Sequence, residues 1–133
     1  MRNYLVKTPV LLKAIYNRCV WHINEHANSV YITFDDGPHI AATPFVLEQL
    51  RKYNAKATFF CIGKNVEEYP DIYQRILDEG HAVGNHTFNH LNGWKSNNFH
   101  YFKNIGKANQ VIRSNIFRPP YGRITYAQAI GIE

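Results

Sequence analysis

Two adjacent carboxylates, Asp35 and Asp36, stand directly before Gly37-Pro38 in the sequence. Where such a pair closes a strand, the turn can bring both side chains to one site. One carboxylate can then act as a base while the other binds a metal ion. Asp-Asp-Gly-Pro is also an ordinary turn sequence, so a plain turn remains the alternative for this segment alone.

A second segment, His-Thr-Phe-Asn-His, holds His86 and His90. On a helical turn, a spacing of four residues places both imidazoles on the same side. Two imidazole nitrogens and a carboxylate make a three-ligand zinc site with its fourth position open. The chain has seven histidines, so a chance pair is the alternative when this segment is considered alone.

A third segment, Arg118-Pro119-Pro120-Tyr121-Gly122, is predicted to be rigid. Its two prolines fix φ and withdraw backbone donors, so the N–H of Tyr121 is expected to point in a defined direction. Arg118 can pair with a carboxylate through a bidentate fork. A simple turn after a strand remains the alternative.

Short apolar runs alternate with helical patterns and predict the elements that position these segments. Strands alternating with helices favour a parallel sheet or barrel, where a site collects at the carboxyl ends of the strands. Each of the three segments follows a predicted strand, so all are expected on one rim. Strands are predicted over 30–34, 57–62, 81–84 and 116–117, and helices from Thr43-Pro44, from Pro70, around 102–112 and from Thr125.

Two of the helices carry specific expectations about their caps and inner faces. Thr43 is expected to be an N-cap, with Pro44 at the first helical position. The helix from Pro70 is expected to end at Gly80. The predicted inward residues are Val46, Leu47, Leu50 and Tyr53 in the first helix, and Ile72, Tyr73, Ile76 and Leu77 in the second.

Composition excludes several classes of protein. Hydrophobic residues make up 45% and charged residues 19% of the 133 residues, which argues against disorder and against a membrane protein. The net charge of +5 comes from scattered lysines and arginines, so no nucleic-acid partner is expected. No signal peptide or membrane span is recognised. Cys61 lies in an apolar run and is expected to be buried, and with Cys19 it makes no disulfide framework.

Together the three segments resemble the polysaccharide deacetylases with the NodB-type domain, also called carbohydrate esterase family 4. Thr33-Phe34-Asp35-Asp36-Gly37-Pro38 is similar to the first motif of that family, 86–90 to the second and 118–122 to the third. The resemblance covers residues 30–122 of a single domain, 1–133. It implies an α/β fold, a (β/α) barrel of the polysaccharide deacetylase type, of which about four βα units are expected here.

The resemblance also implies a role for each residue of the site. Asp36, His86 and His90 would bind one divalent metal ion, zinc in the usual case. Asp35 would be the general base, and Arg118 would hold it in place. The backbone N–H of Tyr121 would stabilise the oxyanion. These roles agree with the chemistry that metal ions, ion-paired carboxylates and fixed donors provide.

The implied reaction is hydrolysis of N-acetyl groups on an acetylated polysaccharide, with peptidoglycan or a chitin-like N-acetylglucosamine polymer as substrate. The fourth motif of the family, an Asp segment ending in Trp, and its Leu-x-His, which supplies a general acid, are not found before Glu133. The domain is therefore expected to be C-terminally incomplete. The alternatives are a catalytically silent metal- or glycan-binding fragment and an acetyl-xylan-type O-deacetylase.

Three further expectations concern the surroundings of the domain. The substrate class suggests the cell envelope or secretion. Open barrel edges are expected to favour self-association of the chain. Trp94 follows the histidine segment and either stacks on a sugar ring or packs its loop onto the body of the domain.

Overall fold

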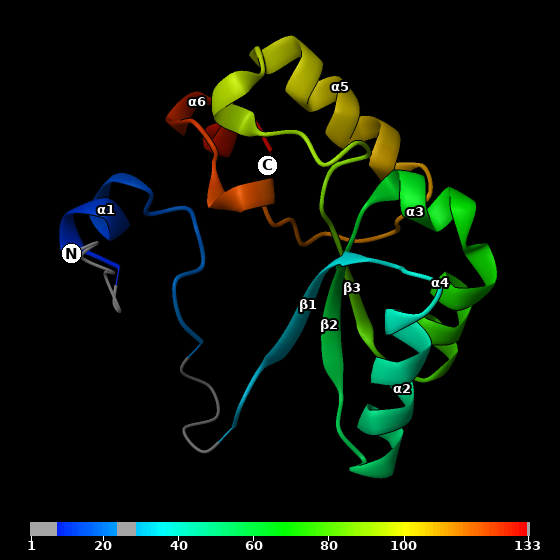
Figure 1. The fold of residues 1–133 in the computed structure, drawn as a ribbon. Coiled ribbons are helices and arrows are strands. Elements are labelled where there is room, and N and C mark those ends of the chain that lie inside the picture. The colour runs from blue at the N-terminus through cyan, green and yellow to red at the C-terminus, as the bar shows by residue number, and fades with distance from the viewer. Residues whose placement is uncertain (1–7, 24–28, 133) are drawn as a thin grey trace, which may run out of the picture.

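The computed structural model of the protein describes residues 8–23 and 29–132. At its centre is a parallel sheet of three strands in the order β1-β2-β3 (Figure 1). The strands are β1 (Ile32–Gly37), β2 (Ala57–Cys61) and β3 (Ala82–Asn85). The helices are α1 (Val10–Ile15), α2 (Ala42–Lys52), α3 (Gly63–Glu68), α4 (Pro70–Asp78), α5 (Asn98–Asn109) and α6 (Tyr126–Ile130), with 3₁₀ turns η1 (Gly93–Lys95) and η2 (Pro120–Gly122).

The three strands run in the same direction because helices connect them. Helix α2 joins β1 to β2, and α3 and α4 join β2 to β3. Ile32 of β1 lies opposite Ala57 of β2, and Thr58 of β2 lies opposite Ala82 of β3. The carboxyl ends of all three strands therefore meet at one edge of the sheet, where chemistry in α/β folds is expected.

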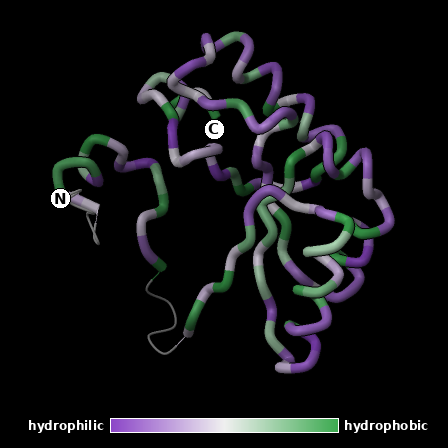
Figure 2. Tube along the Cα trace, in the orientation of Figure 1, coloured by the Kyte–Doolittle hydropathy of each residue, from purple (hydrophilic) through white to green (hydrophobic). Residues whose placement is uncertain are grey.

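The hydrophobic core lies between one face of the sheet and the helices. Phe34 and Phe59 stack with their ring centroids 5.2 Å apart. Leu47 of α2 and Ile76 of α4 pack against the same cluster and are completely buried. Figure 2 shows apolar residues interspersed with polar ones along the helices that flank the sheet, the pattern of helices with one buried face.

The fourth predicted strand is present only as a bridge. Asn85 pairs with Phe117 in an isolated parallel bridge, and Arg118 N–H donates to the Asn85 carbonyl at 3.0 Å. Pro119 and Pro120 follow at once and have no N–H to extend a ladder. The expectation of a strand over 116–117 is therefore corrected to one bridging position beside β3, although Arg118 still lies at the expected rim.

The start of α2 also differs from expectation. The helix begins at Ala42, so Thr43 lies inside it rather than at the N-cap. The imidazole of His39 replaces the expected cap, because its Nδ1 accepts the N–H groups of Ala41 and Ala42 at 3.2 Å each. Thr43 instead accepts the N–H of His39 through Oγ1 at 2.8 Å. A histidine cap of this kind has no recognisable sequence pattern.

Other helix predictions are confirmed in the main. Helix α4 begins at Pro70, buries Tyr73 and Ile76, and is followed by Gly80 at φ 73°. Two predicted inward residues are exposed instead, Tyr53 at 71% and Leu77 at 37%. Tyr53 is the C-cap residue of α2, and Leu77 lies in the last turn of α4. Thr125 caps α6 with a capping box. No helix within residues 8–23 and 29–132 is long and apolar enough to cross a membrane.

Candidate active site

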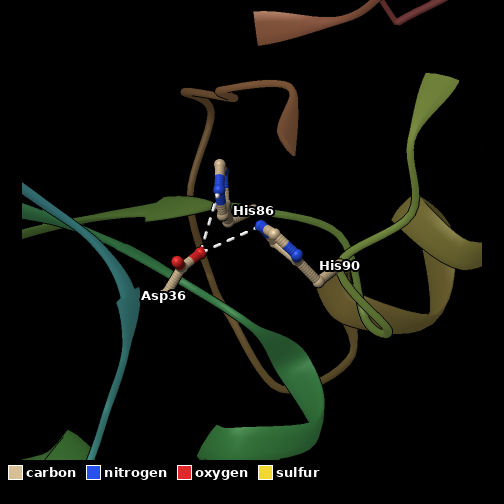
Figure 3. Close-up of side chains that lie close together, drawn as sticks. All are labelled: Asp36, His86 and His90. Carbon is tan, nitrogen blue, oxygen red and sulfur yellow. Dashed lines mark ion pairs between the residues drawn. The ribbon is translucent and has the colours of Figure 1, made fainter. Parts of the chain in front are cut away.

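Three potential metal ligands converge at the carboxyl edge of the sheet. The ligand atoms of Asp36, His86 and His90 all lie within 4.8 Å of one another (Figure 3). Oδ1 of Asp36 is 3.4 Å from Nε2 of His86 and 3.0 Å from Nε2 of His90. His86 is buried, His90 is half-buried and Asp36 is exposed, so the cluster opens to solvent on one side.

A β-bulge explains how two adjacent aspartates serve one site. Asp35 pairs with Phe60 and Gly37 with Cys61, so Asp36 is the extra residue on β1. Its φ of 68° turns its side chain out of the regular alternation of the strand. Asp35 consequently faces Arg118 while Asp36 faces the histidines.

The two histidines meet without the helical turn that their spacing predicts. Residues 86–90 form an irregular loop in which Thr87 has φ 64° and His90 has φ 55°. Thr87 Oγ1 accepts the N–H of Leu91 at 3.0 Å and closes the loop around its buried side chain. The expectation that both imidazoles share a side is confirmed, but the local structure behind it is different.

Two asparagines that sequence reasoning missed hold this loop. Asn85 is buried, accepts the N–H of Thr87 at 2.7 Å and donates to the Ile105 carbonyl at 3.1 Å. Asn104, on α5, accepts the N–H groups of Phe88 and Asn89 at 2.8 and 3.0 Å. Helix α5 is thereby hydrogen-bonded to the loop of the two histidines. Asn85 stands next to His86, but nothing in the sequence indicates Asn104.

The imidazole of His86 is oriented by the main chain of the third segment. Its Nδ1–H donates to the carbonyl of Arg118 at 2.7 Å. A carbonyl only accepts, so the proton lies on Nδ1 and the lone pair of Nε2 faces Asp36. Burial lowers the pKa of His86, partly offset by this hydrogen bond and by the nearby aspartates. The neutral form is the one that binds metal ions.

The guanidinium of Arg118 is held on three sides. Nη1 donates to Oδ1 of Asp35 at 2.7 Å and to Oγ1 of Thr33 at 2.9 Å. Its Cζ lies 3.9 Å from the ring centroid of Phe60, a cation–π contact beneath the ion pair. The pairing with Asp35 is as expected, but it uses one nitrogen rather than a bidentate fork, since Nη1 is shared with Thr33.

Tyr121 lies next to His90. The two rings are 4.6 Å apart between centroids. Tyr121 has φ 60°, and the backbone hydrogen bonds of its turn are donated by Gly122 and Arg123. The N–H of Tyr121 is therefore not one of the donors in the hydrogen bonds of this turn.

Backbone strain is concentrated in the site. Among the described residues, five other than glycine have positive φ, and four of them are Asp36, Thr87, His90 and Tyr121. Each such conformation costs about 1–3 kcal/mol and persists only where its surroundings impose it. The hydrogen bonds that the side chains of Asn85, Asn104 and Thr87 accept provide that constraint for the histidine loop.

The donor set fits a divalent metal ion. Two imidazole nitrogens and one carboxylate oxygen are the ligands of many hydrolytic zinc sites, which leave a position open for water or substrate. The hydrogen bond from His86 Nδ1 to a carbonyl is the outer partner such ligands normally have. Asp35, adjacent to the cluster and paired with Arg118, is available as a base.

Comparison with known proteins identifies the family. The polysaccharide deacetylase family matches residues 22–129, and the chain belongs to this family. A peptidoglycan-N-acetylglucosamine deacetylase of Bacillus cereus is 44% identical over 101 residues, covering 71% of this chain. A chitooligosaccharide deacetylase of Azorhizobium caulinodans is 54% identical over 70 residues, covering 53% of this chain.

A solved structure shows the same fold. The Bc1960 peptidoglycan N-acetylglucosamine deacetylase matches 78% of this chain with a TM-score of 0.77 and 40% identity. The expected α/β fold of the deacetylase type is thus confirmed. The chain spans 51% of that structure, and 37% and 33% of the lengths of the two curated relatives.

Proposed function

We propose that the protein is a metal-dependent hydrolase that removes N-acetyl groups from a polysaccharide. The observation that carries this proposal is the convergence of Asp36, His86 and His90 next to the Asp35–Arg118 ion pair. A metal-ligand set beside an ion-paired carboxylate combines the two parts that hydrolysis of an amide requires. These parts are a polarised carbonyl and a base for the attacking water.

Asp36, His86 and His90 would hold the ion, which we propose is zinc, and the ion would polarise the acetyl carbonyl when bound. Asp35 would accept the proton of the attacking water. Arg118, with Thr33 and Phe60 around it, would hold Asp35 in position. The backbone N–H of Tyr121 would donate to the oxygen on which negative charge develops.

The proposed substrate is a polymer of N-acetylglucosamine, either peptidoglycan or a chitin-like glycan. By their names, one similar protein acts on peptidoglycan and another on chitooligosaccharides. The open side of the metal-ligand cluster, at the exposed Asp36, suits a long substrate that crosses the rim of the sheet. A substrate of this class would be met in the cell envelope or outside the cell.

Release of acetate tests the proposed activity. A version of the protein that also carries the family's general-acid segment, loaded with zinc, should release acetate from N-acetylated chitopentaose or from peptidoglycan, and a chelator should abolish the release until zinc is restored. Release that continues unchanged with the chelator would contradict a metal-dependent reaction. If the glycan and zinc bind but no acetate appears, the protein is instead a metal- and glycan-binding domain.

We also propose that the chain self-associates through β1. This strand is the edge of the sheet, and Val30 and Tyr31 just before it are 87% and 51% exposed. An uncovered apolar edge strand is a template for pairing with another chain. Light scattering should give a mass above that of one chain, whereas a stable monomer at all concentrations would contradict this proposal.

A further inference from the structure

The loop that follows the histidines presents a tryptophan to solvent. Trp94 lies in η1 and is 63% exposed, and Tyr121 is exposed to the same degree. A large aromatic ring at a rim that handles a polymer is a candidate binding surface. A loop tryptophan that only fills a packing gap would instead be largely covered.

The indole is exposed but held at its polar edge. Its Nε1–H donates to the carbonyl of Ile124 at 3.0 Å. The main-chain N–H of Trp94 donates to Oδ1 of Asn92 at 3.1 Å. Arg123 lies over the ring, with Cζ 5.3 Å from the centroid. The polar group of the side chain is therefore satisfied, and Trp94 remains 63% exposed although Arg123 lies over its ring.

A buried glutamine fixes the loop itself. Gln128 of α6 is completely buried and donates through Nε2 to the Gly93 carbonyl at 2.9 Å and to the Ser96 carbonyl at 3.3 Å. A Cβ at Gly93 would lie 2.5 Å from the Arg123 carbonyl oxygen, so only glycine allows this close approach. The loop and the segment after Tyr121 thus form one rigid unit, and Trp94 loses little freedom when a ligand binds.

Both segments of this rigid unit follow directly in the sequence from segments of the site. Trp94 lies four residues beyond His90. Arg123 and Ile124, which contact its ring, come directly after Gly122 in the turn that carries Tyr121. The exposed indole is therefore mounted on the same two segments that present a potential metal ligand and the proposed oxyanion donor.

We propose that Trp94 is a platform on which a second pyranose ring of the glycan stacks, beside the sugar whose acetyl group is hydrolysed. The apolar C–H face of a β-linked N-acetylhexosamine matches an indole face that has no free polar group. The inference rests on the proposed function for the identity of the glycan. It adds a subsite for a neighbouring sugar, so we expect the length of the glycan to matter for binding.

Binding of N-acetylated chitopentaose and of N-acetylglucosamine to the zinc-loaded protein tests the platform by calorimetry. Trp94→Ala should weaken pentasaccharide binding roughly tenfold, the equivalent of one aromatic contact, and leave monosaccharide binding unchanged. Trp94→Phe should retain most of the affinity, because it keeps a ring while losing the bond to Ile124. Trp21→Phe is the matched control and should bind as the unaltered protein does.

Several results would overturn the platform. These are equal pentasaccharide affinity in the unaltered protein and Trp94→Ala, an equal loss in Trp94→Phe and Trp94→Ala, or no pentasaccharide binding by the unaltered protein. Circular dichroism and zinc content should be unchanged in both variants, which separates stacking from misfolding. If Trp94→Ala weakens binding but no form of the protein releases acetate, the platform stands and the proposed activity fails.

Discussion

The backbone carbonyl of Arg118 accepts a hydrogen bond from Nδ1 of His86 at 2.7 Å, while the side chain of Arg118 pairs with Asp35. One residue therefore supports both halves of the proposed site, the metal ligand through its main chain and the base through its guanidinium. A substitution changes only the second of these functions, because every residue supplies the same carbonyl.

Replacing Arg118 with methionine should separate the two functions. We expect Arg118→Met to lower kcat by roughly a hundredfold, because Asp35 loses the ion pair that holds it in place. Zinc affinity, measured by competition with a chelating dye, should hardly change. The exposed Arg113→Met is the control. A large loss of zinc affinity in Arg118→Met would show that the guanidinium also maintains the ligands.

The two aspartates should respond differently to the same change. In a version of the protein that also carries the general-acid segment, Asp35→Asn is expected to retain zinc and lose acetate release, since an amide cannot act as a base. Asp36→Asn is expected to lose zinc affinity, because a neutral amide is a poorer ligand for a divalent ion. Zinc content and acetate release should be measured on both, with the exposed Glu67→Gln as control. The opposite pattern would mean that the roles are reversed.

Gly84 should be essential for the position of Phe60 beneath Arg118. A Cβ at Gly84 would lie 2.4 Å from Cδ1 of Phe60, whose ring contacts the guanidinium at 3.9 Å. We expect Gly84→Ala to lower the free energy of unfolding by about 1–3 kcal/mol through overpacking, and to reduce acetate release as Arg118 is displaced.

Gly106 provides a matched control for that change. A Cβ there meets nothing within 4 Å, and the residue lies inside α5. Gly106→Ala should therefore raise the free energy of unfolding by up to about 1 kcal/mol and leave activity unchanged. Urea unfolding of both variants checks the pair, and equal stability of Gly84→Ala and the unaltered protein would rule out the proposed crowding.

The two thiols should differ in reactivity. Cys61 is completely buried, and burial raises its pKa to about 12, so almost no thiolate exists at pH 8. Cys19 is half-buried, and its pKa is raised by burial as well. Alkylation at pH 8 should add one group to the native protein and two in urea, as measured by intact mass. Rapid addition of two groups without urea would contradict the buried position of Cys61.

Much of the fold follows from local sequence patterns. The apolar run 57–62 becomes β2, and Pro70 and Thr125 mark helix starts as expected. These predictions succeed because alternating hydrophobicity and capping residues act over a few neighbouring positions. The single bridge at Phe117 was not foreseen, because the pairing of 116–117 with β3 is decided by long-range packing.

The site was predicted as a set of residues but not as a geometry. The bulge at Asp36 depends on the register between β1 and β2, which no local pattern specifies. Asn85 and Asn104 shape the loop of His86 and His90. Asn104 lies on α5, 14 residues beyond His90 in the sequence. Residues that act through tertiary hydrogen bonds carry no signal in the motif itself.

The central claim, that Asp36, His86 and His90 hold one metal ion, is tested most directly by elemental analysis of the purified protein. We expect one zinc ion per chain in the unaltered protein and in the exposed-histidine control His100→Ala. The double variant His86→Ala, His90→Ala should contain almost none while remaining folded by circular dichroism. Equal zinc content in the folded double variant and the unaltered protein would contradict the account.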